Sequence, residues 1–107
     1  MEEVGILREV EGFENDPMIE ELGRFAIDEH NKKENVKNGG SVLELVKIAY
    51  ANQQEVVSGM MYYMQLHALD TDQGITFLYV SPVLVKSQDN SKEAQSLVLL
   101  RVLKDDD

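Results

Sequence analysis

The chain has 107 residues and a formal net charge of −10, because 20 acidic side chains outnumber 10 basic ones. Its length is typical of one domain with one hydrophobic core, and its 43% of hydrophobic residues argues against a disordered chain. We therefore expect a single domain over residues 1–107, with an N-terminal arm at 1–8 and an acidic tail at 104–107. The negative charge disfavours nucleic acid and acidic membrane surfaces as partners.

The sequence has no cysteine, which excludes disulfides, thiolate metal ligands and cysteine nucleophiles. Residues 1–3, Met-Glu-Glu, lack the basic and apolar regions of a signal peptide. No run approaches the roughly 18 apolar residues of a membrane span. The compartment stays open, because a cytoplasmic protein and a secreted protein whose signal has been removed would look alike.

A helix is predicted to begin at Asp16-Pro17, an N-cap residue followed by proline at the first helical position. Its apolar side recurs at helical spacing and comprises Ile19, Leu22, Phe25 and Ala26. We expect it to end between Lys33 and Lys37, before the turn signal Asn-Gly-Gly-Ser at 38–41.

Beyond residue 41 the pattern changes to β-branched, aromatic and aliphatic stretches at 42–50, 56–57, 60–69, 75–86 and 96–103. The polar breaks between them, at 51–55, 70–74 and 87–90, are predicted hairpin turns, so neighbouring strands should be antiparallel. This order predicts an α+β domain in which a curved antiparallel sheet of four to five strands wraps around one long helix. Pro82 cannot donate to a strand ladder and is expected at a sheet edge or a bulge.

Catalytic and metal-binding patterns are absent from the sequence. His30 and His67 lie in predicted regular elements without a nucleophile nearby in sequence. The Gly-Gly-Ser at 39–41 follows a helix instead of opening one, and the Asp-rich turn at 70–74 lacks the later glutamate of a calcium loop. We therefore expect no enzyme, no cofactor and no metal site.

Three segments without chemistry are expected to meet at one end of the sheet: the arm around Gly5, the loop at 53–59 and the loop near Ser87-Gln88. In a meander the turns after the first and third strands lie at the same end, and an N-terminal edge strand can begin there. Together they would form a wedge with three contact points.

Residues 22–35, Leu-Gly-Arg-Phe-Ala-Ile-Asp-Glu-His-Asn-Lys-Lys-Glu-Asn, resemble the helix signature of the plant cystatins (phytocystatins), in which Leu-Ala-Arg-Phe-Ala-Val leads into Asp-Glu-His-Asn. Residues 56–63 resemble the inhibitory hairpin of that family and the strand after it, and weaker similarity covers nearly the whole chain. The resemblance implies a cystatin-like fold and reversible, substrate-like inhibition of papain-like cysteine proteases. The wedge would cover the catalytic cysteine of the protease without offering a bond that can be cut.

The resemblance also implies which residues contact the protease: Val4, Gly5, Gln54, Glu55, Val56, Val57, Ser58, Gly59, Ser87 and Gln88. The stiff, apolar side chains of the two valines lose little entropy on docking, and Gly59 permits a close backbone approach.

The contact segments depart from the family pattern. The first loop of the family reads Gln-x-Val-x-Gly, so either Glu55 replaces the glutamine or Glu55 is an insertion after Gln54 that lengthens the hairpin by one residue. The second loop has Ser87-Gln88 where the family has Pro-Trp, which removes a large aromatic anchor. The arm has one glycine instead of a pair. These departures predict weakened inhibition.

Two alternatives remain at this point. The first is a cystatin-fold scaffold or protein-binding module with altered loops that does not inhibit proteases. The second, an enzyme or metal-binding domain, needs a constellation that the sequence lacks. A monomer is expected, with a domain-swapped dimer as the alternative, because the hinge between the first two long strands is where two copies could exchange elements.

Overall fold

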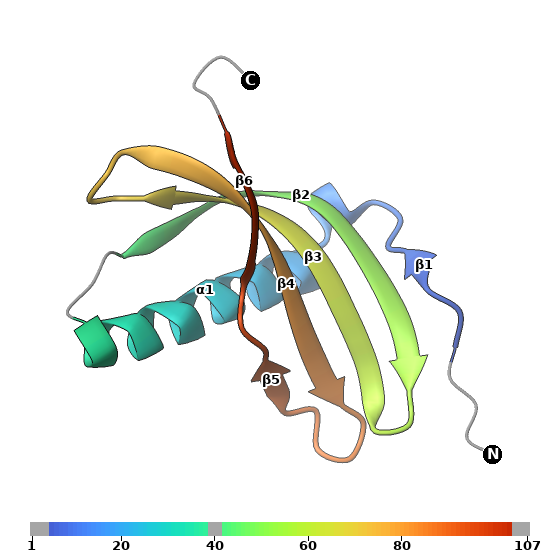
Figure 1. The fold of residues 1–107 in the computed structure, drawn as a ribbon. Coiled ribbons are helices and arrows are strands. Elements are labelled where there is room, and N and C mark those ends of the chain that lie inside the picture. The colour runs from blue at the N-terminus through green and yellow to red at the C-terminus, as the bar shows by residue number, and fades with distance from the viewer. Residues whose placement is uncertain (1–4, 39–41, 104–107) are drawn as a thin grey trace.

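The computed structural model describes the backbone of residues 5–38 and 42–103, and their side chains except those of 35–38. In chain order the elements are β1 (Arg8–Glu9), the 3₁₀ helix η1 (Phe13–Asn15), α1 (Pro17–Asn38), β2 (Leu43–Val56), β3 (Gly59–Asp70), β4 (Ile75–Lys86), β5 (Lys92–Ala94) and β6 (Val98–Leu103). The long strands curve across one side of α1 (Figure 1). The structure confirms the predicted α+β fold.

The six strands form one antiparallel sheet in the order β1-β2-β3-β4, after which β5 and β6 pair with different parts of β4. Strand β3 lies between the long strands β2 and β4 and pairs with both along its whole length. No helix within the described ranges is both long and apolar enough to cross a membrane.

Helix α1 begins where the sequence predicts, because the Asp16 carboxylate accepts the Met18 N–H at 2.9 Å and Pro17 opens the first turn. Among residues 17–34 the buried ones are Ile19, Leu22, Gly23, Ala26 and Ile27, while Phe25 is half-buried. The helix continues to Asn38, past the expected end. Residues 33–38 contain no helix breaker, and the glycine pair comes only after them.

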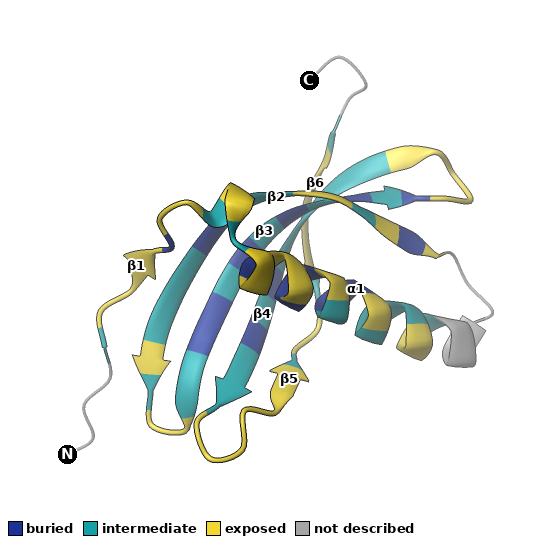
Figure 2. Cartoon of the chain, turned by 180° about the vertical axis from the view of Figure 1, so that it is seen from behind, coloured by how far each residue is buried: buried dark blue, intermediate teal, exposed yellow. Residues whose placement is uncertain are grey.

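The core lies between α1 and the face of the sheet that it covers, where most of the buried positions fall (Figure 2). In the middle of β3 every second residue is fully buried there, namely Met64, Leu66 and Ala68. The amide of Asn31 fixes the helix over the start of β2: its Nδ2 donates to the Leu43 carbonyl at 3.0 Å, and its Oδ1 accepts the Leu43 N–H at 2.9 Å.

The predicted turn at 51–55 is wrong, because these residues continue β2 without a break. Ala51 is fully buried, and Asn52 to Gln54 pair in regular register with Tyr63 to Met61. Polar side chains fit here because the strand lies near the edge of the sheet and leaves them half exposed. The connection to β3 is only two residues long, Val57-Ser58.

Pro82 lies in an inner strand, not at the predicted sheet edge or bulge, and pairs with Tyr63 in regular register. On its other side, the pairing of β4 with β6 stops at Val80 and its pairing with β5 starts at Val83. The Pro82 carbonyl accepts the Gln95 N–H on that side at 2.9 Å. Because the nitrogen and carbonyl of one strand residue point the same way, the missing N–H falls in this gap and costs no bond to β3.

Replacing Asn31 by alanine is expected to lower the free energy of unfolding by about 1–3 kcal/mol, because both backbone groups of the buried Leu43 lose their partner. Urea denaturation followed by circular dichroism measures the change. Asn15→Ala is the control, because the exposed Asn15 side chain makes no hydrogen bond with the described residues. Equal midpoints for the two variants would contradict a clamping role for Asn31.

Candidate functional site

The N-terminal arm lies alongside the end of β2. The Gly5 N–H donates to the Glu55 carbonyl at 2.8 Å, and the Gln54 Nε2 donates to the Gly5 carbonyl at 3.1 Å. These bonds continue the pairing of β1 with β2 beyond Arg8. Val4, the other predicted arm residue, lies outside the described residues.

The first hairpin, between β2 and β3, is tied to the second hairpin, between β4 and β5. The Ser58 carbonyl accepts the Ser87 N–H at 3.0 Å and lies 3.4 Å from the Ser87 hydroxyl, which also donates to it. The arm and both hairpins therefore lie at one end of the sheet, as the strand order predicts (Figure 1). We call residues 5–7, 54–59 and 87–88 the wedge.

Gly59 permits the contact between the hairpins. A Cβ at this position would overlap the Val85 carbonyl oxygen and lie 2.9 Å from the Ser87 nitrogen. Its φ of 155° is also one that residues with a side chain rarely adopt. A glycine is therefore required where β3 begins beside the end of β4.

Apolar side chains are exposed along the wedge. Ile6 is 74% exposed, Leu7 49% and Val57 65%, whereas Val56 is half-buried. A cavity of about 320 Å³ runs between the hairpins, and Met60, Val85, Lys86 and Asn90 line it together with wedge residues. Ile6 and Leu7 were not among the predicted contact residues. The sequence could have pointed to them only as an apolar pair next to Gly5, and such a pair is equally expected in a buried edge strand.

Negative charge lies within the wedge at Glu55 and next to it at Asp89. Glu55 is exposed, and a Cβ on Gly5 would lie 3.0 Å from the Glu55 Cβ. In the second hairpin, hydrogen bonds from the Ser91 side chain and backbone lower the pKa of Asp89, so this carboxylate stays charged in mild acid. Gln88 is exposed beside it, and Lys86 is paired with Glu93 at 3.4 Å.

Glu55 lies in the regularly paired end of β2, outside the two-residue turn. It pairs with Met60 in regular register, and Val56 pairs with Gly59, which leaves the shortest common hairpin loop. The irregularities of β2 lie earlier, between Leu45 and Lys47 and between Ile48 and Tyr50. The loop itself has two residues, and the two alignments of Glu55 with the family motif, replacement and insertion, both stay predictions.

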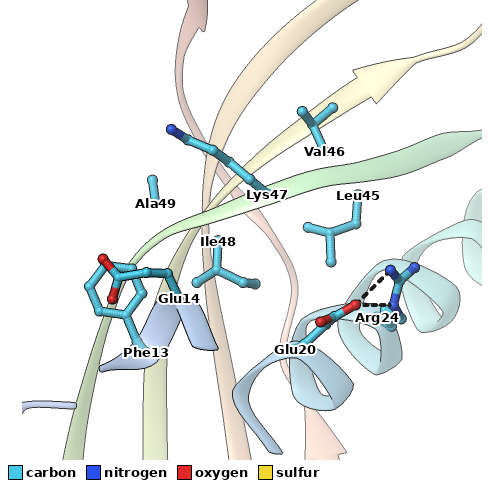
Figure 3. Close-up of a pocket in the computed structure, with 9 residues that line it drawn as sticks. All are labelled: Phe13, Glu14, Glu20, Arg24, Leu45, Val46, Lys47, Ile48 and Ala49. Carbon is cyan, nitrogen blue, oxygen red and sulfur yellow. Dashed lines mark hydrogen bonds and ion pairs between the residues drawn. The ribbon is translucent and has the colours of Figure 1, made fainter. Parts of the chain in front are cut away.

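A separate cavity of about 380 Å³ lies between η1, α1 and β2 (Figure 3). The ion pair in it joins an Arg24 nitrogen to a Glu20 carboxylate oxygen at 2.7 Å, and both side chains are exposed. The two residues are four positions apart, as in an ordinary ion pair on a helix surface. Within residues 5–38 and 42–103 no cluster of three or more His, Asp or Glu side chains is placed to hold a metal ion. This cavity therefore offers no chemistry, and the wedge is the stronger candidate.

Comparison with known proteins agrees with the family resemblance of the sequence. A family model described as aspartic acid proteinase inhibitor matches residues 13–100. "Cysteine proteinase inhibitor A" of Helianthus annuus is 46% identical over 77 residues, which are 72% of this chain and 84% of that protein. "Multicystatin" of Solanum tuberosum is 41% identical over 88 residues, 82% of this chain. The chain belongs to the plant cystatins.

This cystatin spans only 11% of the Solanum protein. It is also 40% identical over 92 residues to "Cysteine proteinase inhibitor 3" of Arabidopsis thaliana, which is 86% of this chain and 67% of that protein. The resemblance seen in the sequence is therefore confirmed. All these names describe inhibitors of proteases and none describes an enzyme, although the family model and the relatives name different classes of protease.

Replacing Gly59 by alanine is expected to destabilise the cystatin by about 2 kcal/mol or more, because the added methyl group displaces β4 from the first hairpin. Thermal unfolding by circular dichroism measures this loss. Gly12→Ala is the matched control: its φ is 69°, but no atom lies within 4 Å of the added Cβ, so only backbone strain of about 1 kcal/mol is expected. A Gly59→Ala variant no less stable than Gly12→Ala would show that the close approach is not required.

Proposed function

We propose that this plant cystatin is a reversible inhibitor of papain-like cysteine proteases, and not an enzyme. The observation that carries the proposal is the exposed apolar edge formed by Ile6, Leu7 and Val57 on segments that are hydrogen-bonded to one another or to β2. The relatives named as cysteine proteinase inhibitors support the protease class. Residues 4–5, 54–59 and 87–88 are the proposed contacts, together with Ile6 and Leu7.

The wedge would inhibit by occupying the cleft of the protease without being cut. The pairing of Val56 with Gly59 and the Ser58–Ser87 bonds hold the first hairpin as a tight turn. No peptide bond of that turn lies in an extended segment that could pass through a cleft. Because the segments are already held in place, little conformational entropy is lost on binding.

Inhibition of an aspartic protease is the second candidate function. The description of the family model that matches residues 13–100 favours it. A wedge of exposed apolar side chains that keeps substrate out of the cleft does not depend on the catalytic group of the protease. The two candidate functions therefore differ in the shape of the cleft that the wedge must fit. The names of the relatives disfavour a scaffold without inhibitory activity.

We also propose that the monomer is the inhibitory form. Exchange of elements between two copies would extend Val57 and Ser58 into one long strand running from β2 to β3. The first hairpin would then be lost from the wedge. Size-exclusion chromatography at two concentrations separates the two forms, and a single concentration-independent species near 12.1 kDa counts against exchange.

Titration of the monomer into papain with a fluorogenic peptide substrate tests the proposal, and pepsin serves as the parallel aspartic protease. We expect saturable inhibition of papain, weakened about tenfold by Val57→Ala, because apolar area at the tip is lost. Val98→Ala is the control, because Val98 is 53% exposed on β6, outside the wedge. Inhibition of pepsin alone would favour the second candidate, and inhibition of neither enzyme by the folded monomer would overturn both.

Replacing Glu55 by glutamine is expected to lower the inhibition constant for papain about tenfold. The reason is that moving an uncharged amide from water into the cleft costs less free energy than moving an unpaired carboxylate. Glutamine also matches the family motif and keeps the length of the side chain. Deletion of Glu55 is a poorer test, because it would shift the register of Val56 against β3. Weaker inhibition by the glutamine variant would show that Glu55 meets a cation of the protease instead.

A further inference from the structure

The sheet face that α1 does not cover carries a row of basic side chains. Lys47 of β2 pairs with His67 of β3, His67 pairs with Leu78 of β4, and Leu78 pairs with Arg101 of β6. Directly paired residues of antiparallel strands project from the same face of the sheet. We call Lys47, His67 and Arg101 the basic row.

The basic row faces away from the core. The neighbours of His67 along β3, Leu66 and Ala68, are fully buried on the side of α1. Figure 3 shows Lys47 on the opposite side of β2 from Leu45 and Ile48, which point toward α1. Partial burial, followed by the positive charges of Lys47 and Arg101, lowers the pKa of His67, as expected if the three groups are close together.

The two cations at the ends of the row have no ionic partner among the described residues. Among the other cations that the structure describes, Arg24, Lys32, Lys86 and Lys92 are in ion pairs, whereas Arg8 and Lys33 are not. Lys47 and Arg101 are exposed and are in none, although acidic residues outnumber basic ones two to one. The acidic residue beside the row on this face is Glu44, which pairs with Leu69.

We propose that the basic row binds a short acidic segment of a second protein, with carboxylates on Lys47 and Arg101 and an apolar side chain between them on Leu78. Three spacings between strands separate the two cations, about 14 Å. An extended chain covers that distance in about four residues. The matching segment therefore has two acidic residues four positions apart with an apolar residue midway.

Charge distribution favours a short segment over a long polyanion. A nucleic acid strand on the row would run onto the surface of a chain whose net charge is −10. A segment of five residues meets mainly the local positive potential. The row also lies eight residues along β3 from Gly59, about 26 Å, so this partner and a protease on the wedge could bind together.

Binding should tighten as the pH falls from 7.5 to 5.5. The groups facing His67 are Lys47 and Glu44 from β2 and Arg101 from β6, while β4 contributes the uncharged Leu78 and Thr76. Partial burial and then the two nearby cations disfavour the protonated imidazole in the free protein, and bound carboxylates would favour it. Binding is then linked to proton uptake, and glutamate carboxylates stay ionised above about pH 5.

The test is an NMR titration of the full ¹⁵N-labelled chain with the peptide acetyl-Glu-Ala-Leu-Ala-Glu-amide at pH 7.5 and 5.5. We expect shifts centred on Lys47, His67, Leu78 and Arg101, tighter binding at pH 5.5, and a raised pKa for His67 when peptide is bound. The double variant Lys47→Gln/Arg101→Gln should bind about fivefold more weakly. Lys32→Gln/Lys33→Gln is the control, because it changes the net charge equally on α1.

Three results would overturn the proposal: equal shifts with the glutamine version of the peptide, shifts spread over the cations of α1, or an unchanged His67 pKa. Tighter binding of a short oligonucleotide than of the peptide would assign the row to phosphate instead. Papain inhibition by Lys47→Gln/Arg101→Gln is measured in parallel and should equal that of the parent, because the row lies outside the wedge. Failure of this proposal is thus distinguishable from failure of the inhibitor proposal.

Discussion

The close approach of Gly59 to the backbone of β4 is the constraint on which the geometry of the wedge depends. Without a side chain at this point, β3 can begin directly beside Val85 and Lys86. Only at that separation can the Ser58 carbonyl reach the Ser87 N–H. The arm then joins the same edge through its bonds to the end of β2.

Much of the fold follows from local sequence signals. Asp16 and Pro17 mark the start of α1, and the apolar spacing within it identifies the buried side. The hairpin turn predicted at 51–55 was wrong because hairpin turns and half-exposed strands have similar polar compositions. Only the pairing register with β3 distinguishes the two. The edge position predicted for Pro82 was wrong for a related reason. An inner strand can have a short unpaired stretch where its pairing passes from one neighbouring strand to another, as β4 does between β6 and β5.

The spatial arrangement of the wedge was predictable in outline, whereas its role in binding a protease stays a prediction. The order of the strands predicts that the arm and both hairpins share one end, and the family signature identifies the same segments. The hydrogen bond between Ser58 and Ser87, and the exposure of Ile6 and Leu7, depend on how those segments pack against one another, which the sequence does not show. The basic row left no local signal, because Lys47, His67 and Arg101 come from three strands far apart in the sequence.

The short pairing of the arm gives the wedge two levels of stability. Strand β1 contributes only two residue pairs to the sheet, whereas β3 is paired along its whole length on both sides. Detachment of the arm is therefore a local opening with a far smaller free energy than global unfolding. If the wedge binds a protease as proposed, the fraction of molecules with a docked arm sets how many can engage it through all three segments at once. Affinity can consequently be tuned at Gly5 and Gln54 while the melting temperature, set by β3 and the core, stays nearly constant.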